Sequence, residues 1–117
     1  MLSKHRFENI FIACGYTDLR LGIDGLAVFL KNQFRLNPYS AETIFLFCGR
    51  RSDRIKALVW EGDGFLLLYK RLEKGRFQWP RNESELKQLS SEQFGRLLSG
   101  FAIESSIKKI TPPKNVV

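Results

Sequence analysis

The sequence predicts a single α+β domain in which two helices cover a mainly antiparallel five-stranded sheet. Its length of 117 residues lies within the range of one domain, and two separate cores would each be too small. Hydrophobic residues make up 44% and charged residues 26%, as in ordinary globular proteins. Short runs of β-forming residues alternate with turn residues and with two segments of helical periodicity. We expect an ordered core from about residue 7 to 105, and a flexible C-terminal tail from about residue 108.

The N-terminal third predicts a strand followed by a helix. Residues 7–14 are rich in β-branched and aromatic types and end at Gly15, which indicates the strand. In the next segment the apolar residues recur at helical spacing: Ile23, Leu26, Ala27, Leu30 and Phe34. Asp24 is the expected cap of this helix. Pro38 ends it, since proline disfavours helical geometry in the residue before it.

The middle of the chain predicts a buried strand and an antiparallel meander. Residues 43–48 read TIFLFC without polar alternation, which is typical of a strand buried on both faces. Three further strands are predicted at residues 55–60, 65–72 and 76–79. Turn signals at residues 61–64 and 73–75 join them, and these three strands form the predicted C-terminal three-strand meander.

The second helix is predicted from its capping residues. Ser90 can cap it together with Gln93 three residues later, while Leu89 and Phe94 are placed to pack across that cap. Its apolar stripe consists of Phe94, Leu97, Leu98 and Phe101. Gly100 is the expected terminator. The preceding polar segment, residues 81–88, is compatible with either a loop or a short helix.

The charge of the chain points to a polyanionic partner. The formal net charge is +7, and the isoelectric point is near 9.7. Residues 50–81 contain nine basic and four acidic side chains, so nine minus four, or +5, of this charge comes from one segment. A concentrated basic segment attracts nucleic acids through their phosphates.

The basic residues of this segment lie close to predicted turns, where they can form one cationic edge. The candidates for nucleic-acid or partner binding are Arg50, Arg51, Arg54, Lys56, Lys70, Arg71, Lys74 and Arg76. The candidate aromatic contacts are Trp60, Tyr69 and Trp79. The alternative is that the aromatic side chains belong to the core and the charges solvate turns.

Catalysis finds little support in the sequence. His5 is the only histidine, and Asp18, Asp24, Asp53 and Asp63 are all explained as cap, turn or charge-balancing residues. The nucleotide-binding glycine motifs are absent. We therefore expect a protein that is not an enzyme and has no cofactor, no catalytic residues and no metal site.

Cysteine usage and hydropathy predict a cytoplasmic protein. Cys14 and Cys48 have neither the spacing of metal ligands nor the density of a disulfide scaffold, so we expect reduced thiols. No apolar run approaches the roughly 20 residues that cross a bilayer, and the first residues lack the apolar stretch of a signal peptide. Membrane association is not expected.

Two stretches resemble a known family. TDLRLGIDGLA at residues 17–27 and RRSDRIKALVWEGDGFLLLYKRLEKGRFQWP at residues 50–80 are similar to the TnpB-type accessory protein, the second open reading frame product, of insertion-sequence family sixty-six. The resemblance extends over about residues 10–100. Leu21, Leu66 and Gln78 depart from the family pattern, in which basic or aromatic residues are common at these places. Each departure removes charge or stacking area.

The resemblance implies non-catalytic help in DNA transposition, with a separate, larger transposase cutting and joining the DNA. We hypothesise that the basic hairpin edge binds DNA. Neutralising about five phosphates would give a slope of about −4 to −5 for log affinity against log salt. The alternative is an adapter that docks on the element-encoded transposase without direct DNA contact. The sequence leaves the oligomeric state open.

Overall fold

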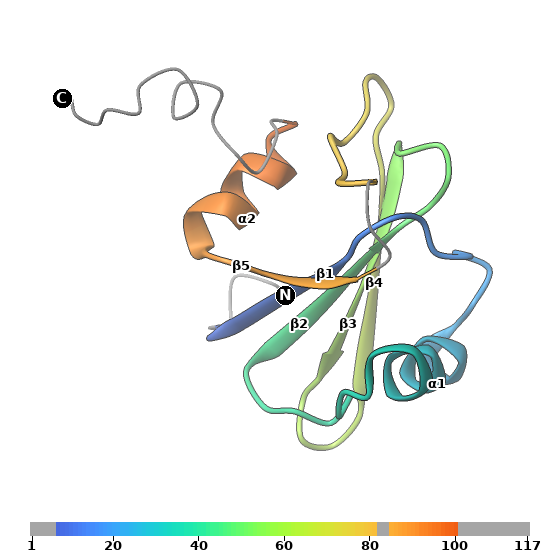
Figure 1. Cartoon of the computed structure of the whole chain (residues 1–117), viewed down its shortest axis with the longest axis vertical. Helices are drawn as coiled ribbons and strands as arrows, with labels where there is room; N and C mark the ends of the chain where they lie inside the picture. Colours follow the sequence, from blue (N-terminus) through green and yellow to red (C-terminus); the bar gives the residue numbers. More distant parts are fainter. Residues whose placement is uncertain (1–6, 82–84, 101–117) are drawn as a thin grey trace, which may run out of the picture.

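Five strands form one sheet in the order β4-β3-β2-β1-β5, and a helix lies on each face of it (Figure 1). The computed structural model describes residues 7–81 and 85–100. The elements along the chain are β1 (Asn9–Ala13), α1 (Ile23–Phe34), β2 (Thr43–Cys48), β3 (Arg54–Trp60), β4 (Phe65–Arg71), β5 (Leu86–Leu89) and α2 (Ser91–Leu98). The predicted α+β class, five strands and two helices are confirmed.

The sheet is mixed, so the prediction of a mainly antiparallel sheet needs correction. β1 and β2 run parallel, with Asn9 opposite Thr43 and Ile12 opposite Leu46. The other three pairings are antiparallel. The physical reason is the connection, because α1 carries the chain back across the sheet and lets β2 start at the same end as β1.

The predicted C-terminal meander is not confirmed, because its third strand is absent. Residues 76–79 leave the sheet and cross its α2 face, where Phe77 is 2% and Trp79 is 6% exposed. The indole Nε1 of Trp79 donates to the Ala13 carbonyl at 2.9 Å. The fifth strand is instead β5, which pairs with β1 at the far edge. It lies in the segment interpreted as a loop or short helix.

The hydrophobic core has two layers because β2 is buried on both faces, as its sequence predicts. On one face Phe45 and Phe47 pack with Leu26 and Leu30 of α1. The other face carries Ile44 and Leu46, which belong to the cluster that also holds Phe77, Trp79 and Leu97. The two faces of β2 therefore contribute to the two separate clusters in which α1 and α2 pack.

The helix ends follow local chemistry, with one correction. α1 is preceded by Gly22, which makes no side-chain cap, and Asp24 lies in the first turn. Asp24 is therefore not the cap; it instead places a negative charge near the helix N-terminus. α1 ends at Phe34, and its C-cap Arg35 adopts the left-handed conformation before Pro38 is reached.

The predicted capping box of α2 is confirmed. The Ser90 hydroxyl accepts from the Gln93 backbone N–H, and the Gln93 side chain accepts from the Ser90 N–H. Gly100 follows the helix at a φ of 89°, as expected of a terminator. Phe101, His5 and the tail from residue 108 lie outside the described residues.

Candidate nucleic-acid interface

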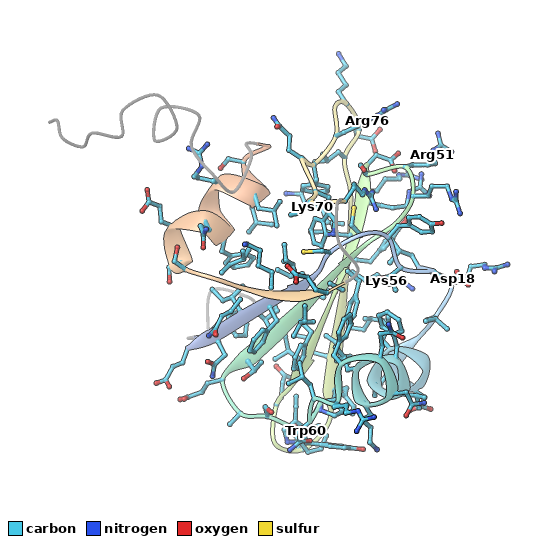
Figure 2. All side chains as sticks on the ribbon, viewed as in Figure 1. Asp18, Arg51, Lys56, Trp60, Lys70 and Arg76 are labelled. Atoms are coloured by element: carbon cyan, nitrogen blue, oxygen red, sulfur yellow. The ribbon has the colours of Figure 1, made fainter. Side chains whose placement is uncertain are left out.

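Two loops that are distant in sequence meet at one end of the sheet. The turn between β2 and β3 closes with Ser52 in the left-handed conformation, at a φ of 63°. The segment after β4 is fastened to this turn, because the Leu72 N–H donates to the Asp53 carbonyl and the Phe77 N–H donates to the Ser52 carbonyl, both at 2.7 Å. Figure 2 shows Arg51 and Arg76 at this end and Trp60 at the opposite end.

A groove of about 960 Å³ opens at this end, on the α1 side of the sheet. Its walls are the segment after β1, the β2–β3 turn and the adjoining parts of β3 and β4. The groove is lined by Tyr16, Thr17, Asp18, Leu19, Arg20, Gly49, Arg50, Arg51, Arg54, Lys56, Leu67 and Tyr69. Four of the eight predicted basic residues are therefore brought together in one concave surface.

Two of the groove cations are positioned by tyrosines. The Arg50 guanidinium donates to the Tyr16 hydroxyl at 3.0 Å, and its Cζ lies 4.3 Å from the centroid of the same ring. The Lys56 ammonium donates to the Leu21 carbonyl at 3.0 Å and lies 5.9 Å from the Tyr69 centroid. Cation–π contacts of this kind hold a charge in place while leaving it partly open to water.

Carboxylates at the groove reduce its positive charge. Asp53 pairs with Arg54 at 2.9 Å, and the hydrogen bond from Arg54 lowers the pKa of Asp53. Asp18 pairs with Arg20 at 2.9 Å, and hydrogen bonds from the Arg20 side chain and backbone lower the pKa of Asp18 to about 2. Both acids are ionised at neutral pH, so these pairs add little net charge for a ligand.

A known protein family matches most of this chain. The model of the family described as "IS66 Orf2 like protein" matches residues 8–108. The chain belongs to this family of insertion-sequence proteins. It is 37% identical over 101 residues to the "Uncharacterized protein y4hO" of Sinorhizobium fredii (strain NBRC 101917 / NGR234), covering 86% of this chain and 87% of the relative. Another protein of that strain, y4jC, is 32% identical over 101 residues, or 86% of each chain. No solved structure matches.

Membership of the IS66 Orf2-like family confirms the resemblance seen in the sequence, and with it an insertion-sequence accessory protein. The matched range includes every residue of the groove. The β2–β3 turn and the residues after β1 therefore lie within the part of the chain that the family model matches.

The remaining predicted basic residues of this IS66 Orf2-like protein surround the same end but do not line the groove. Arg71, Lys70, Lys74 and Arg76 are exposed. Arg71 lies opposite Arg54 on the groove side, and one of its nitrogens is 3.8 Å from Glu73. Lys70 alternates with Arg71 along β4 and therefore belongs to the other face of the sheet. The predicted cationic edge is divided between two faces.

The three predicted aromatic residues occupy three different environments. Tyr69 lines the groove and is 54% exposed. Trp79 is buried in the core and presents no face to a ligand. Trp60 lies at the other end of the sheet, in contact with Tyr39 and Phe65 at centroid distances of 4.9 Å each. Of these three, Tyr69 alone lies beside the basic residues of the groove.

Sequence reasoning missed Tyr16, which is 56% exposed and lines the groove. It stands alone in an irregular segment, so no periodicity or charge pattern marks it. Its role as a platform for Arg50 depends on contact across 34 positions of sequence.

Arg81 also has a role that the sequence does not reveal. It donates to the carbonyls of Gly15 and Gly49 at 2.6 and 2.5 Å, and to the Ser52 hydroxyl at 2.5 Å. Its guanidinium therefore joins the two loops that form the groove. Arg81 is one of the basic residues included in the +5 charge of residues 50–81.

The acidic and thiol groups do not assemble into a metal centre within residues 7–81 and 85–100, where no three His, Cys, Asp or Glu side chains could hold an ion. Asp63 lies in the turn between β3 and β4, at the end of β3 opposite Asp53. Cys14 and Cys48 are buried and form no disulfide. Burial raises the pKa of Cys48 to about 11. No helix among these residues is long and apolar enough to span a membrane.

Proposed function

We propose that this IS66 Orf2-like protein is a non-catalytic accessory factor that works in the cytoplasm and assists transposition by binding DNA in the groove. The observation that supports the proposal is the arrangement of Arg50, Arg51, Arg54 and Lys56 around one concave surface. Arginine and lysine are the side chains that most often contact backbone phosphates, and such contacts need no base sequence.

The groove cations are not equivalent toward phosphate. Arg50 and Arg51 are exposed, whereas Arg54 is paired with Asp53, and Lys56 donates to a backbone carbonyl. We therefore expect two to four phosphates to be neutralised. At about −0.9 per phosphate, the slope of log affinity against log salt would be about −2 to −4, shallower than the whole +5 segment would produce.

Fluorescence anisotropy with a labelled duplex at several salt concentrations tests this proposal. The double variant Arg50→Ala/Arg51→Ala is expected to bind more weakly and to reduce the slope by about two. A matched control is Lys31→Ala/Arg35→Asn, which removes the same charge around the end of α1, outside the groove. Asparagine suits the left-handed conformation of Arg35.

The control separates site-specific contact from general attraction, because both double variants change the net charge by the same amount. Equal losses of affinity in the two variants would contradict the groove as the binding surface. A salt-independent affinity, or no binding to duplex DNA at low salt, would contradict DNA binding itself.

A protein adapter is the second candidate, favoured by the exposed arginines outside the groove. Arg76 lies at the groove end of the molecule (Figure 2), and Arg71 lies opposite Arg54 at the same end. Arginine is enriched at protein interfaces. A pull-down of the element's transposase that survives nuclease treatment, but is lost in Arg71→Glu/Arg76→Glu, would support this function. Loss of the complex on nuclease treatment would contradict it.

A further inference from the structure

β4 is an edge strand with an apolar sequence. It pairs with β3 on one side, and no other strand within residues 7–81 and 85–100 pairs with its second side. Phe65, Leu66, Leu67 and Leu68 are only half-buried, and the strand contains no proline. Edge strands usually carry charge or proline along their length, because open backbone groups invite pairing with another chain. On β4 the charges are confined to its last two residues, Lys70 and Arg71.

The hydrogen bonds of the β3–β4 ladder show which backbone groups face outward. The Leu72 N–H bonds to the Asp53 carbonyl at 2.7 Å, and the Glu61 N–H bonds to the Gly64 carbonyl at 2.9 Å, at the two ends of the same register. Bonded and non-bonded pairs alternate in an antiparallel ladder. The residues that bond to β3 are therefore Leu66, Leu68 and Lys70. Those whose N–H and C=O groups face the open edge are Phe65, Leu67, Tyr69 and Arg71.

We infer that β4 pairs antiparallel with β4 of a second copy of this chain, in a register centred on Leu68. Each outward-facing residue then meets an outward-facing residue, since Phe65 opposes the partner's Arg71 and Leu67 opposes the partner's Tyr69. This register pairs all seven residues of the strand. It also satisfies backbone donors and acceptors that an open edge leaves to water.

The charges of β4 lie at one end of the strand, which suits a second copy paired antiparallel rather than parallel. In the antiparallel register Lys70 opposes the partner's Leu66, so the cations of one copy lie beside apolar residues of the other. Parallel pairing in register would place Lys70 beside Lys70 and Arg71 beside Arg71, and directly opposed like charges are destabilising. The half-buried leucines would also lose contact with water, which favours association.

Pairing would place both grooves on the same face of one continuous sheet. A two-fold axis through Leu68, perpendicular to the sheet, reverses the strand direction but keeps the face. Arg71 is three residues from Leu68, so the two Arg71 residues would lie roughly 20 Å apart along the strands, at about 3.4 Å per residue. The pairing does not depend on DNA binding, although two grooves on one face would suit a long polyanion.

Cysteine cross-linking of the full chain tests the register. Leu68→Cys is expected to form a disulfide-linked dimer under mild oxidation, because the Cα atoms of a directly opposed non-bonded pair are about 4.5 Å apart, within the range of a disulfide. Leu66→Cys is the matched control. It lies on the same face with similar burial, but it opposes the partner's Lys70, about 14 Å along the strand from the second cysteine. The native Cys14 and Cys48 are buried, and the unmodified chain controls for them.

Charge substitutions give a test that needs no oxidation. Leu68→Glu would set two carboxylates against each other and convert the dimer to a monomer in light scattering. Leu66→Glu would set a carboxylate against the partner's Lys70 and leave the dimer intact. Circular dichroism of both variants verifies folding. The inference is overturned if the unmodified chain is monomeric at every concentration tested, or if Leu66→Cys cross-links as readily as Leu68→Cys.

Discussion

Asp18 and Arg20 show how two residues set the charge at the rim of the groove. The Arg20 side chain donates to both carboxylate oxygens of Asp18, at 3.0 and 2.9 Å, and its backbone N–H donates at 3.0 Å. Hydrogen bonds to a carboxylate favour its charged form. The pair thus extends the ionised range of one acid beside the groove arginines down to about pH 2.

The first prediction concerns this pair. Arg20→Ala is expected to raise the pKa of Asp18 from about 2 toward its ordinary value of 3.8, as measured by carboxyl NMR titration. Because the folded-state pKa lies below the ordinary value, the pair's contribution to stability is complete above about pH 3.8 and is lost as the pH falls to about 2. Asp53 serves as the control, since its lowered pKa depends on Arg54 and should stay unchanged. An Asp18 pKa still near 2 in the variant would contradict the assignment.

The start of helix α2 is determined by residues within one turn. It has eight residues, too few for a helix that is stable without packing or caps. The capping box at Ser90 and Gln93 satisfies two backbone donors that would otherwise have no partner. Leu97 then holds the helix against the core.

The second prediction tests this cap. Ser90→Ala is expected to lower the free energy of unfolding by about 1 kcal/mol, because the Gln93 N–H loses its acceptor at the helix start. Urea denaturation measures the change. Ser91→Ala, one residue further and also exposed, removes the same hydroxyl and should change stability by less than about 0.5 kcal/mol. Equal effects of the two substitutions would argue against a specific cap.

At the scale of the whole molecule, Arg81 joins segments that no local interaction connects. Its acceptors follow β1 and form the β2–β3 turn, at sequence separations of 66, 32 and 29 residues. A guanidinium suits this place, because its planar group donates in several directions at once. The groove therefore depends on a residue that does not line it.

The third prediction follows from that role. Arg81→Lys keeps the charge but cannot reproduce the three hydrogen bonds, so it is expected to lower the free energy of unfolding by roughly 2 kcal/mol. It should also weaken DNA binding if the proposed groove is the contact surface. Arg76→Lys is the matched exposed control and should alter stability little. Urea unfolding measures the first effect and anisotropy the second. Unchanged stability in Arg81→Lys would show that the loops are held by other contacts.

Features with a local cause could be predicted from the sequence alone. The helical periodicity of α1, the burial of β2 on both faces and the capping box of α2 each follow from the spacing or type of a few neighbouring residues, although the two ends of α1 differ from those expected. The family was recognisable for a similar reason, because its signature is a continuous block of residues. The basic segment was visible as composition, and half of its candidate residues line one groove.

Only the tertiary structure decided that β1 runs parallel to β2, that β5 pairs with β1, and which residues line the groove. Residues 76–79 alternate like a strand, yet burial of Phe77 and Trp79 across the α2 face outweighs another strand pairing. Tyr16 and Arg81 gained their roles through contacts with residues far along the chain. Such contacts depend on how whole elements pack, and packing free energy is summed over surfaces that no short stretch of sequence contains.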